Sequence, residues 1–405
     1  MIIEENKRYA MFVESPEKAK TINKIFKDSG IKNIFVMATI GHFIKIADGK
    51  GFCNTGIYPE NDFKADFIID PAKADNVKKL KEQVKIADNV LVATDPDREG
   101  EAIAWSCVKF LNIPKNKYKR VTYHAINKKA ILDGIANASE LDENLVKAAN
   151  ARRILDKILG FSISSSLRDN KKGKSGGRVQ SAALRMIVER EEEILNFKPE
   201  KYIDLYLNFS KNGTEFKAKY QGTDSKNIDK LKTQEEVDAI FNDCKGNDFI
   251  IGDIENKIKN DNPRVPFCTA TFQQEAYNKL GLVTEQAQSC AQKLFDSGKI
   301  SYHRTDSEQF EPEFENELKA FVKDNFKPEY VSGKVTKGKI DENEQGGHEA
   351  LHVLDLNLTP EKYAKEAPSE LLVKVYRIIY NRPVSTALNP AIIAQTTYNI
   401  YNKYN

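Results

Sequence analysis

The sequence predicts a multidomain protein whose N-terminal α/β domain is built on a mostly parallel sheet and is followed by helical and β-rich regions. Three observations lead to this prediction. Apolar runs alternate with helical patterns up to about residue 145, helical periodicity dominates from there to Leu195, and period-two patterns typical of antiparallel strands come next. With 405 residues, the chain is long enough for about two to four domains, each with its own core.

The composition is that of a globular protein, with 40% hydrophobic and 30% charged residues and a formal net charge of +3. No run of eighteen apolar residues occurs, so no membrane span is expected, and the N-terminus has no apolar stretch of the secretory type. The 5 cysteines are scattered without a Cys-x-x-Cys pair. This spacing argues against a zinc ribbon or a disulfide framework and fits a reducing cytoplasm.

The α/β region contains three strand-like runs, which are expected at residues 9–14, 34–39 and 89–94. Ser15 and Pro16 follow the first run and have the residue types of an N-cap and a first helical position. Ligands of parallel sheets bind at the carboxyl ends of the strands. Glu14, His42 and Asp95 all lie at such ends and are therefore candidate site residues.

An acidic cluster follows the third run, with Asp95, Asp97 and Glu99 at alternate positions. Carboxylates that crowd one strand end repel each other unless a cation joins them, and a hard divalent ion such as Mg²⁺ is the natural partner. Glu14 from the neighbouring strand end would complete an oxygen cage. Such a triplet alone is more often an acidic surface turn. Lys18, near a helix N-terminus, suits a phosphate.

A tyrosine lies beside a guanidinium in the segment that holds Tyr302 and Arg304. Phenol is a weak nucleophile at its ordinary pKa of about 10 and needs a neighbouring cation or base. Arg304 could supply positive charge both to the phenolate and to a phosphate under attack. Together with the acidic cluster, this pair predicts an enzyme that breaks a phosphodiester by forming a protein–phosphate bond.

Two other segments admit more than one interpretation. The basic, glycine-rich stretch before Arg178 and Gln180 could hold a nucleic-acid backbone, or could be a helix cap beside a flexible connector. The segment from His348 to His352 matches His-Glu-x-x-His, so a zinc protease has to be considered. No third ligand motif follows, and the preceding stretch is rich in glycine rather than helical, which disfavours that alternative.

Five segments resemble type IA DNA topoisomerases and occur in the order of that family: VESPEKAKTI (13–22), ATIGH (38–42), ATDPDREGEAIAW (93–105), GRVQS (177–181) and ISYHRTDS (300–307). The resemblance implies a Toprim domain, of Rossmann-like type, with an acidic set that binds Mg²⁺. The residues of that set are Glu14, Asp95, Asp97 and Glu99.

The same resemblance implies roles in the reaction. Tyr302 matches the nucleophile that forms a 5′-phosphotyrosyl link to one DNA strand, Arg304 the arginine at the scissile phosphate, and Lys18 the active-site lysine. Residues that match positions near the bound single strand are His42, Arg178, Gln180 and His348. A family member relaxes negative supercoils without ATP, and we expect a monomer with DNA as its partner.

The resemblance also implies a domain organisation. It comprises a Toprim domain (1–145), a helical DNA-binding gate region (146–200), a β-rich arch segment (201–264), a helical domain with the catalytic tyrosine (265–388) and the start of a returning arch strand (389–405). The chain departs from the family pattern at His352, where arginine is usual, and at His303, where methionine is common. It ends where the family re-enters the arch, so we expect the C-terminal part of the core to be lacking.

Two alternatives stay open. A Toprim-type metal-dependent nuclease or primase would use the acidic cluster and leave Tyr302 idle. A truncated, inactive DNA-binding relative would bind DNA and form no covalent adduct. Trapping of a covalent protein–DNA adduct distinguishes both from a topoisomerase.

Overall fold

The structure, a computed structural model, describes residues 3–223, 226–227, 230–338 and 349–402. It forms two compact units. The first consists of Met1–Ser181 and Pro263–Asn389, and the second of Ala182–Asn262 and Pro390–Asn405. In the described part of the chain, no helix has both the length and the apolar character needed to cross a membrane.

A four-stranded sheet forms the centre of the N-terminal region of the first unit, and all its neighbouring strands are parallel. Its strand order is β2 (Ile34–Ala38), β1 (Tyr9–Val13), β7 (Asn89–Val92) and β8 (Tyr118–Arg120). Every residue of β1 is buried and apolar, as is typical of a central strand that is covered on both faces. The predicted parallel α/β sheet is confirmed.

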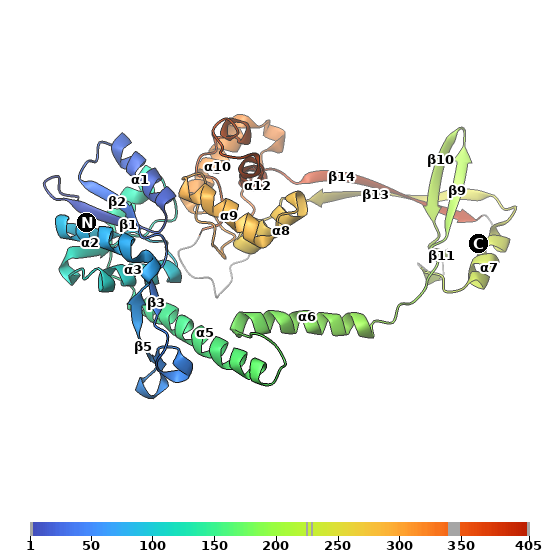
Figure 1. Ribbon diagram of the computed structural model, residues 1–405. Coiled ribbons are helices and arrows are strands. Elements are labelled where there is room, and N and C mark those ends of the chain that lie inside the picture. The colour runs from blue at the N-terminus through green and yellow to red at the C-terminus, as the bar shows by residue number, and fades with distance from the viewer. Residues whose placement is uncertain (1–2, 224–225, 228–229, 339–348, 403–405) are drawn as a thin grey trace. The chain divides into compact units, whose positions relative to one another are not determined.

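Helices cover both faces of this sheet (Figure 1). They are α1 (Pro16–Asp28), α2 (Ala74–Ile86), α3 (Arg98–Phe110) and α4 (Lys128–Ala136). One hydrophobic cluster contains Met11 of β1 together with apolar residues of α1 and α4. A second cluster contains Phe12 of β1 together with apolar residues of α2 and α3. Alternate residues of one strand therefore belong to two different cores.

Short strands and two long helices complete the first half of the chain. The short strands form two antiparallel pairs, β3 (Ile44–Ile46) with β6 (Phe67–Ile69) and β4 (Ile57–Tyr58) with β5 (Lys64–Ala65). The long helices are α5 (Glu143–Asp169) and α6 (Arg178–Asn196). They are separated where the sequence becomes rich in glycine and lysine, as the loss of helical periodicity there predicts.

The region that carries Tyr302 is helical. Its helices are α8 (Thr269–Leu280), α9 (Thr284–Asp296), α10 (Pro312–Asn325), α11 (Pro360–Tyr363) and α12 (Glu370–Thr386). Tyr302 lies in the segment after α9, and Ile300 of that segment forms an isolated β-bridge with Val353. Apolar residues of these helices belong to the same cluster as Met11 of the sheet, so the helices and one face of the sheet share a core.

The second unit contains the β-rich part of the chain. β9 (Tyr206–Lys211) and β10 (Thr214–Lys219) form an antiparallel hairpin, as the period-two patterns of this region predict, and Asn212 and Gly213 both have positive φ at its turn. The other elements are β11 (Gly222–Thr223), β12 (Lys226–Asn227), α7 (Gln234–Cys244), β13 (Phe249–Asp261) and β14 (Ala391–Asn402). β13 pairs antiparallel with β14.

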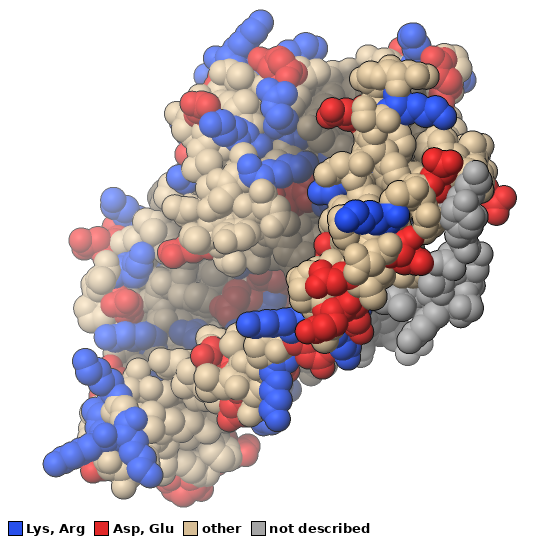
Figure 2. Space-filling view, turned by 90° about the vertical axis from the view of Figure 1, so that its right-hand side faces the viewer, with Lys and Arg blue, Asp and Glu red and all other residues tan. Residues whose placement is uncertain are grey.

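Lysine and arginine side chains are interspersed with aspartate and glutamate on the face shown in Figure 2, in keeping with the small net charge of +3. Interspersed charges of both signs give no strong long-range field of one sign. Any attraction of this face for a nucleic acid therefore has to come from local contacts.

Gly298 lies where the tyrosine-bearing segment comes close to the α/β region. Its φ is +69°, and a Cβ there would lie 2.7 Å from the carbonyl oxygen of Ile126. Gly298→Ala is therefore expected to lower the free energy of unfolding by about 2–3 kcal/mol, since left-handed strain alone costs about 1–2 kcal/mol. Gly281→Ala is the matched control, because Gly281 has a φ of +67° but no atom near its Cβ position. Equal losses of unfolding free energy for the two variants, measured by urea unfolding, would contradict the close approach of the Gly298 Cβ position to the Ile126 carbonyl.

Candidate active site

Glu14 and Asp95 meet at the carboxyl ends of neighbouring strands. β1 and β7 are parallel neighbours, and the residues that follow them come together because the amide of Asp95 donates to Glu14 Oε1 at 3.1 Å. Ser15 caps α1 by accepting a hydrogen bond from the amide of Lys18. Asp97 caps α3 by accepting one from the amide of Gly100 at 2.7 Å. The strand ends thus place three predicted residues (Glu14, Asp95 and Asp97) at one edge of the sheet.

A buried arginine holds the backbone of this acidic turn. Arg120, at the end of β8, donates to the carbonyl oxygens of Thr94 (2.8 Å) and Asp95 (2.7 Å) and to the Glu101 carboxylate (2.7 Å). Because both charges of the Arg120–Glu101 pair are buried and hydrogen-bonded, the pair fixes a defined geometry. The sequence analysis did not identify Arg120, since a lone arginine at a strand end gives no local signal.

Lys18 is fully buried and forms an ion pair with Asp95. Burial alone would lower the pKa of Lys18, but the negative charges of the surrounding groups, with Asp95 first and Glu14 among the others, outweigh burial and raise it. Its ammonium also lies 4.9 Å from the ring centroid of Phe295. Lys18 is therefore a fixed positive charge inside the site at neutral pH.

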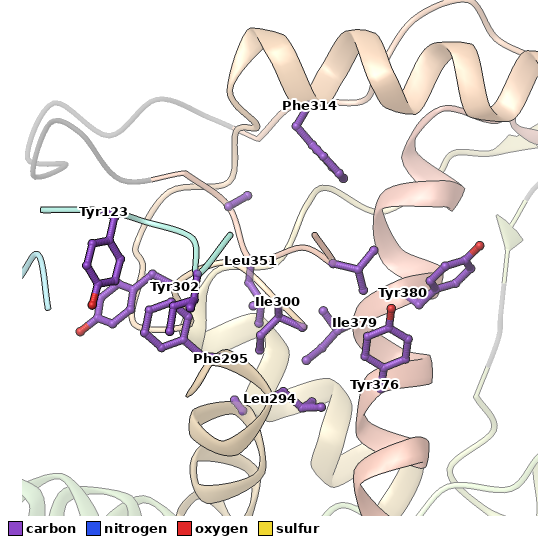
Figure 3. Packing of buried hydrophobic residues seen from close by; sticks show 14 of the residues in the cluster. Tyr123, Leu294, Phe295, Ile300, Tyr302, Phe314, Leu351, Tyr376, Ile379 and Tyr380 are labelled. Atoms are coloured by element: carbon purple, nitrogen blue, oxygen red, sulfur yellow. The ribbon is translucent and has the colours of Figure 1, made fainter. Parts of the chain in front are cut away.

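Tyr302 faces the acidic turn from the helical region. Its hydroxyl donates to Asp97 Oδ2 at 2.5 Å, its backbone amide donates to the carbonyl oxygen of His124 at 2.9 Å, and it is only 2% exposed. Figure 3 shows its ring against Phe295, with a centroid separation of 5.2 Å, and Tyr123 nearby. Burial, followed by the charges of the neighbouring carboxylates, raises the pKa of Tyr302 above its ordinary value. Tyr302 is thus a neutral phenol whose hydroxyl proton is already hydrogen-bonded to the Asp97 carboxylate.

Arg304 lies on the solvent-exposed side of the same group of residues. Its side chain is 52% exposed, and Nη1 lies 3.6 Å from Asp97 Oδ2, the oxygen that also accepts from Tyr302. Burial alone would lower the pKa of Arg304, but its electrostatic interactions with the neighbouring Tyr302 and Asp97 raise it. An exposed guanidinium next to a buried phenol can contact an incoming anion without leaving its partners.

His303, the departure from the family pattern beside Tyr302, is buried at 1% exposure. Burial, and then the charge of Arg304, lower the pKa of His303 to about 3, so the ring is neutral at physiological pH. Its Nδ1 has no hydrogen-bond partner among the described residues. His303 therefore adds no positive charge to the site.

The residues predicted to bind DNA are placed at separate points. His42 Nε2 lies 2.7 Å from Glu99 Oε2, which brings His42 to the acidic turn. Arg178 donates to Asp156 of α5 at 2.7 and 3.2 Å, and Gln180 is exposed on α6. His348 lies outside the described residues.

The His-Glu-x-x-His match has no helical geometry in its described part. Residues 349–352 are not helical, and Leu351 forms an isolated β-bridge with Phe267. The ring of His352 stacks on Phe314 with a centroid separation of 3.6 Å, and its Nδ1 lies 2.7 Å from the carbonyl oxygen of Val353. Metal sites of that motif need both histidines on one helix face, so the zinc-protease interpretation has no structural support here.

The acidic residues have the chemistry of a magnesium site but are held by different partners. Asp95 pairs with Lys18, Asp97 accepts from Tyr302, and Glu99 pairs with His42. Within residues 3–338 and 349–402, apart from 224–225 and 228–229, no three His, Cys, Asp or Glu side chains converge closely enough to hold a metal ion.

The raised pKa of Glu14 indicates that the carboxylates around it lack a compensating positive charge. Burial, and then the charge of Asp95, raise the pKa of Glu14 to about 8. A divalent cation beside these oxygen ligands would relieve that repulsion, so the residues fit a hard cation, provided that some of the carboxylates turn away from their present partners.

The raised pKa of Glu14 predicts a pH-dependent stability. The folded protein binds this proton more tightly than the unfolded chain, where the pKa is about 4.3. The protonated Glu14 therefore contributes its full stabilisation to the folded state below about pH 4.3, and this stabilisation is lost as the pH rises through about 8. Glu14→Gln keeps a neutral side chain, so in EDTA its advantage over wild type in thermal midpoint should grow by about 2–6 °C between pH 5.5 and pH 8.5.

Glu17→Gln is the matched control for this measurement, because Glu17 is exposed on the same helix. A constant difference between Glu14→Gln and wild type across the pH range would contradict the raised pKa.

A parallel sheet whose strand-end carboxylates meet a buried tyrosine from a helical region is the arrangement that the resemblance to Toprim-containing DNA topoisomerases implies. Comparison with known families agrees: residues 10–126 match the Toprim domain, and residues 140–405 match the DNA topoisomerase family. The chain belongs to this family of DNA topoisomerases, and the type IA assignment made from the motifs is confirmed. A Toprim domain is a metal-binding domain, typically for Mg²⁺.

Among solved structures, the chain is similar to full-length topoisomerase I from Thermotoga maritima, with 31% sequence identity and a TM-score of 0.79. The match covers 97% of this chain and 63% of that chain. The present chain therefore spans less than two thirds of the length of that relative.

Proposed function

We propose that the protein is a type IA DNA topoisomerase that breaks one DNA strand by attack of Tyr302, passes a strand through the break and reseals it, thereby relaxing negative supercoils. The single observation that carries the proposal is the Tyr302 hydroxyl, which donates to Asp97 at 2.5 Å in a site that also contains the Lys18–Asp95 ion pair and the Arg304 guanidinium 3.6 Å from Asp97. A nucleophile, a proton acceptor and two positive charges are thus brought together from separate parts of the sequence.

In the cleavage step, the Tyr302 oxygen attacks the phosphorus and its proton passes to Asp97. The bond to the 3′ oxygen breaks, and that oxygen takes a proton from Glu14, whose pKa of about 8 keeps it protonated at neutral pH. Lys18 and Arg304 stabilise the negative charge on the phosphate in the transition state. The new bond is a 5′-phosphotyrosyl ester.

Resealing is the reverse of these steps. The phosphotyrosyl ester retains the energy of the phosphodiester, so the reaction requires no ATP. Mg²⁺ would be held by Asp95, Asp97 and Glu99 with Glu14, and when bound it would supply positive charge near the phosphate and the broken end.

The DNA strand at the cleavage site is proposed to be single-stranded. His42, Arg178, Gln180 and His348 are the proposed contacts along it. The unpaired backbone is available to basic and polar groups of this kind. We further propose that the protein acts as a monomer in the cytoplasm.

The domain boundaries are proposed as predicted, with a Toprim domain at 1–145, a gate region at 146–200, an arch segment at 201–264, a tyrosine-bearing domain at 265–388 and a returning arch strand at 389–405. The antiparallel pairing of β13 with β14 supports the last two boundaries, because it joins the arch segment to the strand that follows α12.

The proposal is tested by incubation of the protein with a single-stranded oligonucleotide and Mg²⁺, followed by denaturing electrophoresis. A label at the 3′ end of the oligonucleotide should migrate with the protein, whereas a label at the 5′ end should be released, because the link is to a 5′ phosphate. Cleavage of the oligonucleotide without a covalent adduct would favour a metal-dependent nuclease. Binding of the oligonucleotide with neither cleavage nor an adduct would favour an inactive relative.

A further inference from the structure

Asp296 is an acidic residue at a place where a carboxylate is unfavourable. It is the last residue of α9 and is only 6% exposed. The C-terminal end of a helix carries partial negative charge, so an acidic group there is repelled. Burial adds to this cost and raises the pKa of Asp296. A carboxylate in such a position needs compensating partners.

Most of those partners come from the N-terminal half of α1, in the α/β region, and one comes from α9 itself. Ser15 Oγ donates to Asp296 Oδ2 at 2.7 Å, and Lys18 Nζ lies 3.9 Å from Oδ1, which also accepts from Gln292 at 2.8 Å. The backbone carbonyl of Asp296 accepts from Thr21 Oγ1 at 2.8 Å. The end of α9 is thus bound to the beginning of α1 through both its side chain and its backbone.

Lys18 consequently lies between two carboxylates from different regions. Asp95 belongs to the acidic turn of the sheet, and Asp296 belongs to the helical region that carries the tyrosine. The residue before Asp296 is Phe295, whose ring contacts both the Lys18 ammonium and the Tyr302 ring. Two consecutive residues therefore fix the position of Lys18 relative to Tyr302.

We infer that Asp296 is a positioning residue for strand cleavage, which holds the Lys18 ammonium beside Tyr302; this inference rests on the proposed function. A phosphate that enters the site competes with Asp95 for Lys18, because both are anions. The ion pair between Asp296, in the tyrosine-bearing region, and the Lys18 ammonium then remains in place. It does not contact the phosphate and acts only through Lys18.

The inference is tested with a double-mutant cycle on the rate of adduct formation. Asp296→Asn keeps the shape of the side chain and removes its charge. It should slow cleavage about tenfold, which corresponds to about 1.4 kcal/mol. In the Lys18→Met background, the same substitution should change the rate less than twofold, since Asp296 then has no ammonium to position. Equal effects in both backgrounds would overturn the inference, because independent sites are additive.

Two further variants separate positioning from packing. Ser15→Ala removes one hydrogen bond to the carboxylate, together with the N-cap bond from the Lys18 amide, and should slow cleavage in the same direction as Asp296→Asn. If the Asp296→Asn variant does not fold, Ser15→Ala takes its place in the double-mutant cycle. Thr21→Val removes the hydrogen bonds of the Thr21 hydroxyl to the backbone carbonyls of Asp296 and Glu17, leaves the partners of the Asp296 carboxylate in place and should cleave at the wild-type rate. A slow Thr21→Val variant with a normal Ser15→Ala variant would contradict a role for the carboxylate.

Failure of the proposed function gives a different result. If the wild-type protein forms no adduct at all, the proposed reaction is wrong. The cycle is then measured on affinity for the same oligonucleotide. A loss of about threefold or more on Asp296→Asn that disappears with Lys18→Met would still support positioning of Lys18. Additive losses of affinity would overturn it.

Discussion

Tyr302→Phe is expected to abolish the covalent protein–DNA adduct and DNA relaxation, with a loss on the order of 10⁴-fold or more, because the variant has no nucleophile in contact with Asp97. The phenylalanine ring keeps the packing against Phe295, so the fold and the affinity for single-stranded DNA should change little. The measurement is single-turnover cleavage of a 3′-labelled oligonucleotide, together with a binding assay on the same strand.

Tyr123→Phe is the matched control for this variant. Tyr123 is also buried, and its hydroxyl donates to the carbonyl oxygen of Ala93 at 3.0 Å. Removal of that hydroxyl should cost about 1 kcal/mol of stability and leave adduct formation intact. Loss of the adduct in both variants would show that the tyrosine hydroxyls are needed for folding rather than for chemistry. An adduct in Tyr302→Phe would assign the nucleophile to another residue.

Lys18→Met is expected to slow cleavage about 10²–10³-fold, the usual cost of one preorganised charge or donor at a developing anion. The variant also leaves Asp95 buried without its cation, which should lower the free energy of unfolding by about 3 kcal/mol. Both effects have one physical cause, because the buried ammonium balances carboxylates before DNA binds and a phosphate afterwards. Cleavage rates at saturating oligonucleotide and urea unfolding measure them separately.

Lys20→Met provides the control for that variant, since Lys20 is an exposed lysine on the same helix. It should be close to wild type in rate and stability. A Lys18→Met variant that cleaves as fast as Lys20→Met would contradict the role of the buried ammonium, even if it were less stable.

Local sequence signals were sufficient for the α/β half of the site and for one hairpin of the second unit. Ser15 at the start of α1 and the asparagine–glycine turn of the β9–β10 hairpin are formed by residues that are neighbours in the chain. Parallel strands also align their carboxyl ends, so the convergence of Glu14 and Asp95 followed from the order of strands and helices. In these cases the physical cause of the structure lies within a few residues.

The contacts that complete the site could not be predicted in this way. The hydrogen bond from Tyr302 to Asp97 joins residues 205 positions apart, and that from Ser15 to Asp296 joins residues 281 positions apart. Neither pair leaves a local pattern, because each depends on how two separately formed regions pack. Only the position of Asp296 at a helix C-terminus, where a carboxylate is disfavoured, offered a hint.

The most direct test of the account is mass spectrometry of the protein–DNA adduct after digestion with a protease and a nuclease. The account predicts a single modified peptide in which Tyr302 carries a 5′-phosphate-linked nucleotide, with the modification absent when DNA is omitted. A nucleotide attached to any other residue, or a link through a 3′ phosphate, would contradict it.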